Sequence, residues 1–171
     1  MRKLLAALVA IGLAAGSARA ELPRPDADDG AIQLPPGFRA LVVADNLGPL
    51  RFMTVAQNGD VYVKMRSVGI IALRDTDGDG RADVRAAFGS GGGTGIALRD
   101  GWLYDSTDSE VRRYPMAPGE LVPKGEPETV VSGLPDERQH SAKSFAFDDQ
   151  GRLYVEVGSP SDEMYFIASG R

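Results

Sequence analysis

The sequence contains a single histidine, His140, in the stretch DERQHSAK. A neutral imidazole can remove a proton near neutral pH, because its ordinary pKa is about 6.5. The adjacent Gln139 offers an amide that can hydrogen-bond a ligand. With one histidine and no cysteine, the chain lacks a histidine pair for zinc, thiolate metal sites, a cysteine nucleophile and disulfides. On these residues alone, a solvated loop histidine is the favoured interpretation of His140, and a general base is the alternative.

A second group of candidate residues lies in the stretch RDTDGDGRAD. Calcium takes six to eight oxygen ligands from a flexible loop, and carboxylates at alternating positions can wrap one ion. The motif is not an EF-hand, because position twelve of such a loop is Ala86 and not glutamate. A solvated acidic turn between two strands is the other interpretation. The candidate metal ligands are Asp75, Asp77, Asp79 and Asp83.

Composition and charge limit the class of protein. The 171 residues are 43% hydrophobic and 25% charged, which suits one globular domain with a core. The net charge of −5 and the absence of a basic cluster argue against a nucleic-acid partner. The glycine-rich GSGGGTG matches no phosphate-binding motif, and we expect it to be a turn with close backbone approach.

The N-terminus resembles an export signal. Arg2 and Lys3 precede an apolar run of 12 residues, and Ala18-Arg19-Ala20 supplies the small residues of a cleavage site. Residues 1–20 are therefore predicted to be a signal peptide, and the run is too short to span a bilayer. We expect a periplasmic or secreted protein without a membrane span. Residues 21–37, rich in proline and aspartate, are predicted to be a disordered leader.

From residue 38 onward the chain has the pattern of an all-β protein. Short runs of β-branched and aromatic residues alternate with turns rich in Gly, Asp and Asn, and no window sustains a helical stripe. Asn58-Gly59 is expected to form a two-residue type I′ hairpin turn. The predicted strands are Phe38–Ala44, Phe52–Gln57, Asp60–Met65, Gly69–Arg74, Asp83–Phe88, Thr94–Leu98, Trp102–Ser106, Glu110–Met116, Glu128–Ser132, Ser144–Asp148 and Arg152–Gly158.

These strands fall into repeats. A Gly-x-φ-Tyr element, in which φ is apolar, opens a strand three times, and its tyrosines are Tyr62, Tyr104 and Tyr154. Repeats of four short antiparallel strands at this spacing predict a β-propeller, with an all-β sandwich as the alternative. Residues 52–88 and 94–132 form two blades, and 144–158 form half of a third. Because propellers close with about four or more blades, residues 38–171 are predicted to be a partial propeller, the N-terminal part of a larger protein. Its open strand edge would favour self-association.

Strand alternation also assigns the loops to the two ends of the blades. Loops after the second and fourth strands share one end, and loops after the first and third share the other. His140 precedes the first strand of the third blade, so we expect it to share an end with Gly89–Gly93, Asp108 and Asp162. The Asp75–Asp83 loop follows a third strand and is expected at the opposite end.

The loops and repeats together resemble the glucose/sorbosone dehydrogenase family. The resemblance covers residues from about Phe38 to Ser161, including GGGTGIALRDGWLYDSTDSEVRRYPMAPGELVPKGEPETVVSGLP and RQHSAKSFAFDDQGRLYVEVGSPS. It implies an exported six-bladed propeller that binds pyrroloquinoline quinone (PQQ) and oxidises sugars. His140 matches the position of the family's catalytic base, and Gln139 is expected to contact quinone or sugar. After Ser161 the sequence departs from the family pattern.

The resemblance implies further groups that later blades would supply, namely cations for the quinone carboxylates and a calcium ion at the cofactor. The leading hypothesis is a PQQ-dependent oxidoreductase that oxidises aldoses or sorbosone-like aldehydes and passes electrons to an acceptor. As a partial propeller, the chain is expected to be inactive alone. The alternatives are a calcium-dependent lactonase-like hydrolase and a non-enzymatic binding module.

Overall fold

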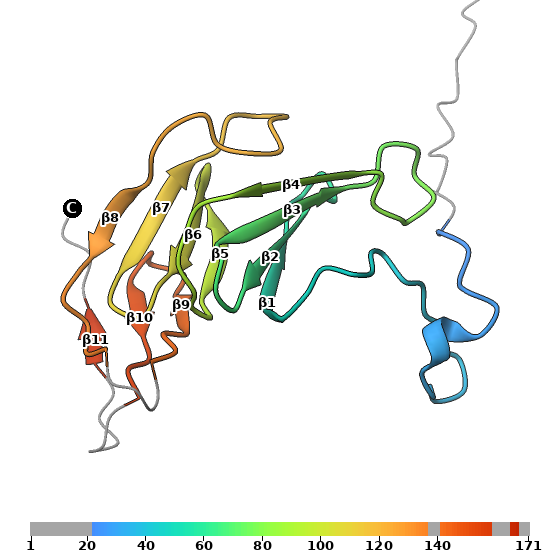
Figure 1. Ribbon diagram of the computed structural model, residues 1–171, viewed down its shortest axis with the longest axis horizontal. Coiled ribbons are helices and arrows are strands. Elements are labelled where there is room, and N and C mark those ends of the chain that lie inside the picture. Colours follow the sequence, from blue (N-terminus) through green and yellow to red (C-terminus); the bar gives the residue numbers. More distant parts are fainter. Residues whose placement is uncertain (1–21, 137–140, 159–164, 168–171) are drawn as a thin grey trace, which may run out of the picture.

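Three antiparallel sheets form the described part of the computed structural model, which comprises residues 22–136, 141–158 and 165–167. They follow one another along the chain and fan out as successive blades (Figure 1). No α-helix occurs among these residues, so they contain no helix that could cross a membrane. The strands are β1 (Leu50–Val55), β2 (Val61–Met65), β3 (Ile70–Arg74), β4 (Val84–Phe88), β5 (Ile96–Arg99), β6 (Trp102–Ser106), β7 (Val111–Pro115), β8 (Glu128–Val131), β9 (Phe145–Phe147), β10 (Leu153–Val155) and β11 (Tyr165–Ile167).

The prediction of a partial β-propeller is confirmed. The first two sheets have the strand orders β1-β2-β3-β4 and β5-β6-β7-β8, as expected for four-stranded blades. The third sheet has the order β11-β10-β9, so it contains one strand more than the predicted half blade. The sequence pattern missed β11 because it lies after the point where the chain leaves the family pattern.

The inner hairpins use two different turns. The expected type I′ turn at Asn58-Gly59 is wrong, because only Gly59 has a positive φ and its N–H donates to the carbonyl of Ala56 at 3.0 Å. That geometry is a three-residue loop ending in a left-handed glycine. A two-residue loop occurs instead in the second blade, where Asp100 and Gly101 have φ values of 49° and 78°. The dipeptide alone could not distinguish these turns, since both require glycine at the last loop position.

The sheets pack through alternating faces. Tyr62, Ile70 and Ala72 of the first sheet bury themselves against Ile96 and Leu103 of the second. The second sheet repeats this arrangement with the third through a separate cluster, listed here in chain order: Val111, Leu134, Leu153, Val155 and Val157. The middle sheet thus presents one apolar face to the first sheet and the other to the third. The core consists of these interfaces between blades.

The strand predicted at Phe38–Ala44 is absent. This segment instead runs beside the Asp75–Asp83 loop, and Val43 accepts a backbone hydrogen bond from Ala82 at 2.8 Å. The predicted disordered leader also makes specific contacts. Its carboxylates accept hydrogen bonds from this segment, Asp26 from the Val42 N–H and Asp29 from the Ala40 N–H. Side chains therefore satisfy backbone groups that a sheet neighbour would otherwise have bonded.

Candidate functional site

A buried charge cluster joins the first two blades at the end where β2 and β6 finish. Lys64 and Asp105 are both 0% exposed, and the Lys64 Nζ lies 2.6 Å from an Asp105 carboxylate oxygen. Arg112 contacts the same carboxylate through Nε at 3.1 Å and through a terminal nitrogen at 2.8 Å. The Asp105 carboxylate is therefore itself unexposed and has two cationic partners, of which Arg112 is slightly exposed. A buried pair of this kind depends on both signs being present.

The cluster also binds the glycine-rich turn. The Lys64 ammonium donates to the Gly91 carbonyl at 3.3 Å, and Arg112 donates to the Ser90 carbonyl at 2.8 Å. Burial lowers the pKa of Lys64 below its ordinary value. The negative charge of Asp105 and its hydrogen bond to Lys64 raise that pKa and so offset part of the effect. The turn and the ends of the strands are thus held together at this end of the blades.

The turn itself passes very close to neighbouring backbone. A Cβ at Gly92 would overlap the Arg66 carbonyl, and one at Gly93 would overlap the Ser106 carbonyl. A Cβ at Gly95 would overlap the Phe145 ring of the third blade. Glycine is required here by space, as expected for a turn between blades rather than for a phosphate-binding loop.

Ser106 anchors the segment that follows His140. Its hydroxyl accepts from the Gly95 N–H at 2.8 Å and donates to the Lys143 carbonyl at 2.6 Å. Because Ser106 is 0% exposed, water does not compete for these bonds. The second blade therefore fixes the backbone three residues after the candidate base.

Lys143 carries a second buried ammonium at this end. The residue is 0% exposed, and its Nζ donates to the Ser141 carbonyl at 2.9 Å. No carboxylate of the described residues lies within ion-pair distance of it, in contrast to Lys64. Burial lowers its pKa, opposed by the more distant charges of Asp108 and Asp136. Among residues 22–136, 141–158 and 165–167, the one acceptor recorded for this ammonium is the Ser141 carbonyl, and an ammonium has three donors.

The Asp75–Asp83 loop forms at the opposite end of the first blade. Ligand oxygens of Asp75, Asp77 and Asp83 lie within 4.8 Å of one another, whereas Asp79 is not in this group. Asp75 accepts backbone N–H bonds from Gly78 and Gly80, both at 2.7 Å, and these bonds lower its pKa. The loop is therefore closed by its own carboxylates, three of which converge.

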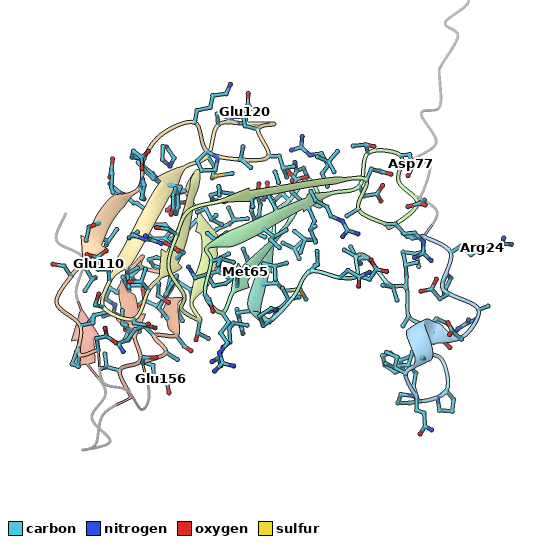
Figure 2. The ribbon with its side chains drawn as sticks, viewed as in Figure 1. Arg24, Met65, Asp77, Glu110, Glu120 and Glu156 are labelled. Carbon is cyan, nitrogen blue, oxygen red and sulfur yellow. The ribbon has the colours of Figure 1, made fainter. Side chains whose placement is uncertain are left out.

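The predicted separation of the two ends holds for the described residues. Lys64, Gly91 and Lys143 lie at one end, and the acidic loop extends from the other. Figure 2 shows Asp77 and Glu110, which belong to loops after a third and a second strand, on opposite sides of the molecule. Gln139, His140 and Asp162 lie outside the described residues, so their assigned end stays a prediction.

Sequence reasoning missed Lys64, Asp105, Arg112, Ser106 and Lys143. One signal was available: Lys64 interrupts the apolar strand VYVKM at a position whose side chain faces the next sheet. A charge there predicts a buried partner on that sheet. The identity of the partner depends on how the first sheet packs on the second, which no local pattern contains.

A model described as TrAA12-like matches residues 32–167. The chain belongs to the TrAA12-like family. The resemblance to PQQ-dependent sugar dehydrogenases is thereby confirmed at the level of the family. A comparison with curated protein sequences gives no match.

Solved structures confirm the fold. The holo form of the PQQ domain of pyranose dehydrogenase from Coprinopsis cinerea has a TM-score of 0.67 at 18% identity, covering 84% of this chain and 34% of that one. The calcium structure of Trichoderma reesei carbohydrate-active enzyme family AA12 has a TM-score of 0.61 at 20% identity, covering 70% and 32% respectively. This TrAA12-like chain therefore spans about a third of the length of these structures.

Proposed function

We propose that this chain supplies the general base and one anion-binding residue of a PQQ-dependent oxidoreductase. The enzyme would oxidise aldose sugars or sorbosone-like aldehydes. The observation that carries the proposal is the buried Lys143 ammonium, three residues beyond His140, whose Nζ donates to the Ser141 carbonyl and pairs with no carboxylate in the part of the chain that the structure describes. PQQ is a quinone that bears carboxylates, and it accepts a hydride when bound. Lys143 would pair with one of those carboxylates, and such charge-assisted bonds are roughly twice as strong as neutral ones.

His140 would accept the proton of the sugar hydroxyl or hydrated aldehyde. A base must have a fixed backbone to act at hydrogen-bond distance. The Ser106 bond to the Lys143 carbonyl supplies that support from the second blade. Gln139 would hydrogen-bond the quinone or the sugar through its amide. Export to the periplasm or beyond, which the N-terminal segment predicts, would place the enzyme and its electron acceptor outside the cytoplasm.

The test is direct binding of PQQ to two lysine variants of a complete propeller that carries these residues. Replacing Lys143 with methionine should weaken PQQ binding by about 10-fold or more, because a charge-assisted hydrogen bond contributes about 1.5–3 kcal/mol. Lys124→Met is the matched control, since Lys124 is 77% exposed and pairs with Glu120. Quenching of intrinsic fluorescence during titration measures both affinities. Equal affinities for the two variants would remove Lys143 from the cofactor site.

The second proposal concerns the acidic loop, which we expect to bind calcium. The three convergent carboxylates of Asp75, Asp77 and Asp83 support it, whereas Asp79, the fourth candidate ligand, lies outside that group. Calorimetry should show a calcium isotherm for the unmodified chain that is lost in Asp77→Ala. Asp149→Ala is the control, since Asp149 is exposed in a turn of the third sheet. No heat in the unmodified chain, or the same heat in Asp77→Ala, would leave a solvated turn.

A further inference from the structure

A cleft lies between the first two sheets, at the end of the blades that carries the acidic loop. Its volume is about 680 Å³, and it is bounded by the β1–β2 turn at residues 56–60, the β5–β6 turn at residues 99–101 and the loop at residues 116–120 that follows β7. Figure 2 shows Glu120 of this last loop along the upper margin of the molecule and Glu110, from the opposite end, lower down. The cleft is therefore separate from the candidate site around Lys143, and its size suits a small molecule.

The cleft contains a buried hydroxyl group that has no protein partner. Tyr62 lines the cleft and is 2% exposed, and its hydroxyl forms no hydrogen bond with the residues that the structure describes. Burial, with a smaller contribution from the charge of Asp60, raises the pKa of Tyr62 to about 12. The hydroxyl is therefore neutral, and it can donate one hydrogen bond and accept others. Because an unpaired buried hydroxyl costs free energy, a ligand that bonds it would be stabilised.

An ion pair holds the cleft in shape. The Arg74 guanidinium donates to both carboxylate oxygens of Asp60, at 2.7 and 2.6 Å, and Asp60 is 2% exposed. One terminal nitrogen of Arg74 also donates to the Gly119 carbonyl at 3.1 Å. Since Arg74 belongs to the first blade and Gly119 to the second, these bonds fix the two walls relative to each other. The cleft is thus preformed, which lowers the cost of binding.

The other charged groups at the cleft are paired as well. Asp100 lies 3.2 Å from Arg99, and Glu120 lies 2.7 Å from Lys124. With the buried pair, three carboxylates are matched by three cations among the described residues around the cleft. A site without excess charge favours neither a metal ion nor an anion, whereas a neutral polar ligand is compatible with it.

Apolar side chains complete the walls of the cleft. Trp102 lines it and is partly buried, with the Arg113 guanidinium 4.1 Å from its ring centroid. Leu98 and Met116 also line it. A sugar carries both C–H surfaces and hydroxyls, so it requires apolar contacts and hydrogen-bond partners in one site. We propose that this cleft binds a neutral saccharide, which contacts Trp102 and hydrogen-bonds the Tyr62 hydroxyl. This site lies outside the proposed catalytic site and does not depend on it.

The first test uses the fluorescence of Trp102, the only tryptophan in the sequence. Titrating the 171-residue chain with cellobiose or maltose, without PQQ, should change this fluorescence in a saturable way. Tyr62→Phe keeps the ring and should weaken binding by about 3–10-fold, as for loss of one neutral hydrogen bond. Tyr114→Phe is the matched control, since it removes a hydroxyl from the same core cluster outside the cleft, and it should bind normally. No saturable change with either sugar, or equal affinities for the two variants, would overturn the proposal.

The second test blocks the cleft without touching the core. Ala117 lines the cleft and is exposed, so Ala117→Lys should fold normally and abolish binding. Ala87→Lys, on an exposed position of β4, should leave binding unchanged. Persistent binding by Ala117→Lys would place the sugar elsewhere and overturn the proposal.

Competing ligands test the chemical class. Glucuronic acid should bind no more tightly than glucose, because the cleft has no excess positive charge. Tighter binding of the acid would mean an anion site and overturn the assignment. Displacement of cellobiose by a soluble glucan would support a polymer segment as the occupant, and cellobiose binding that the glucan does not displace would support a free sugar.

Discussion

Replacing Asp105 with asparagine should lower the free energy of unfolding by about 3–5 kcal/mol, because it leaves two cations without the carboxylate that they share. Lys64 would keep the Gly91 carbonyl as its partner, and it is 0% exposed. Chemical denaturation at pH 7 measures the change. The same substitution alters the pH dependence: burial already lowers the pKa of Lys64, and without Asp105 that pKa should fall further. Between that lowered pKa and the ordinary lysine pKa of about 10.4, the unfolded chain holds a proton that the folded chain has lost. The free energy of unfolding of the variant should therefore rise as the pH rises through this range.

Two comparisons separate this effect from ordinary loss of contact. Lys64→Met should destabilise the chain less than Asp105→Asn, since Asp105 would retain Arg112 at 2.8 Å. Glu128→Gln should cost about 0–1 kcal/mol, because its pair with Arg113 lies at the surface. A loss for Asp105→Asn as small as that for Glu128→Gln would show that the cluster contributes little to holding the two blades together.

Replacing His140 with alanine in a complete propeller that carries these residues should lower the rate of dye reduction by about 10²–10⁴-fold, as for loss of a general base. PQQ binding should change far less, since the cation proposed to hold the quinone is Lys143. The activity of the unmodified protein should fall at acidic pH, because an imidazolium cannot accept a proton. His140→Ala should lack that acidic limb. A variant that keeps turnover would exclude His140 as the base.

The 171-residue chain alone should show little turnover with PQQ, calcium and aldoses. Positioning of reactants can contribute about 7–11 kcal/mol to catalysis, and the groups that the family resemblance assigns to later blades are not among these residues. Gln139→Ala in the complete propeller is the companion measurement: it should raise KM for the sugar or weaken PQQ binding while sparing most of kcat. Strong dye reduction by the unmodified 171-residue chain would mean that the cofactor site lies within the first three sheets.

The sheets could be predicted from the sequence because their signals are local. Alternating apolar residues and glycine turns identified both four-stranded blades, and the repeated tyrosines gave their spacing. The alternating direction of the strands was enough to predict that the acidic loop and the glycine-rich turn lie at opposite ends of the blades. The prediction of a strand at Phe38–Ala44 failed for a non-local reason: its composition suits a strand, but no strand among the described residues pairs with it.

The candidate site was less accessible to sequence reasoning. Three of the four aspartates converge, but which one stands apart depends on the turns around the loop glycines. Lys143 and Ser106 lie 37 residues apart, and their bond exists only because the second and third sheets stack. Charges and hydroxyls inside strands indicate that buried partners exist. Only the packing of one sheet on another identifies them.

The sequential stacking of the sheets also determines how the chain opens. Each sheet contacts its neighbours in the row, so local unfolding should proceed from the two ends, as in other repeat architectures. The middle sheet is covered on both faces, whereas β1 has an uncovered side. Amide hydrogens of β6, beside the fully buried Leu103, should therefore exchange with deuterium most slowly. Those of β1, where Met53 and Val55 are 61% and 57% exposed, should exchange earlier, so exchange rates along the row would rank the sheets by how well each is covered.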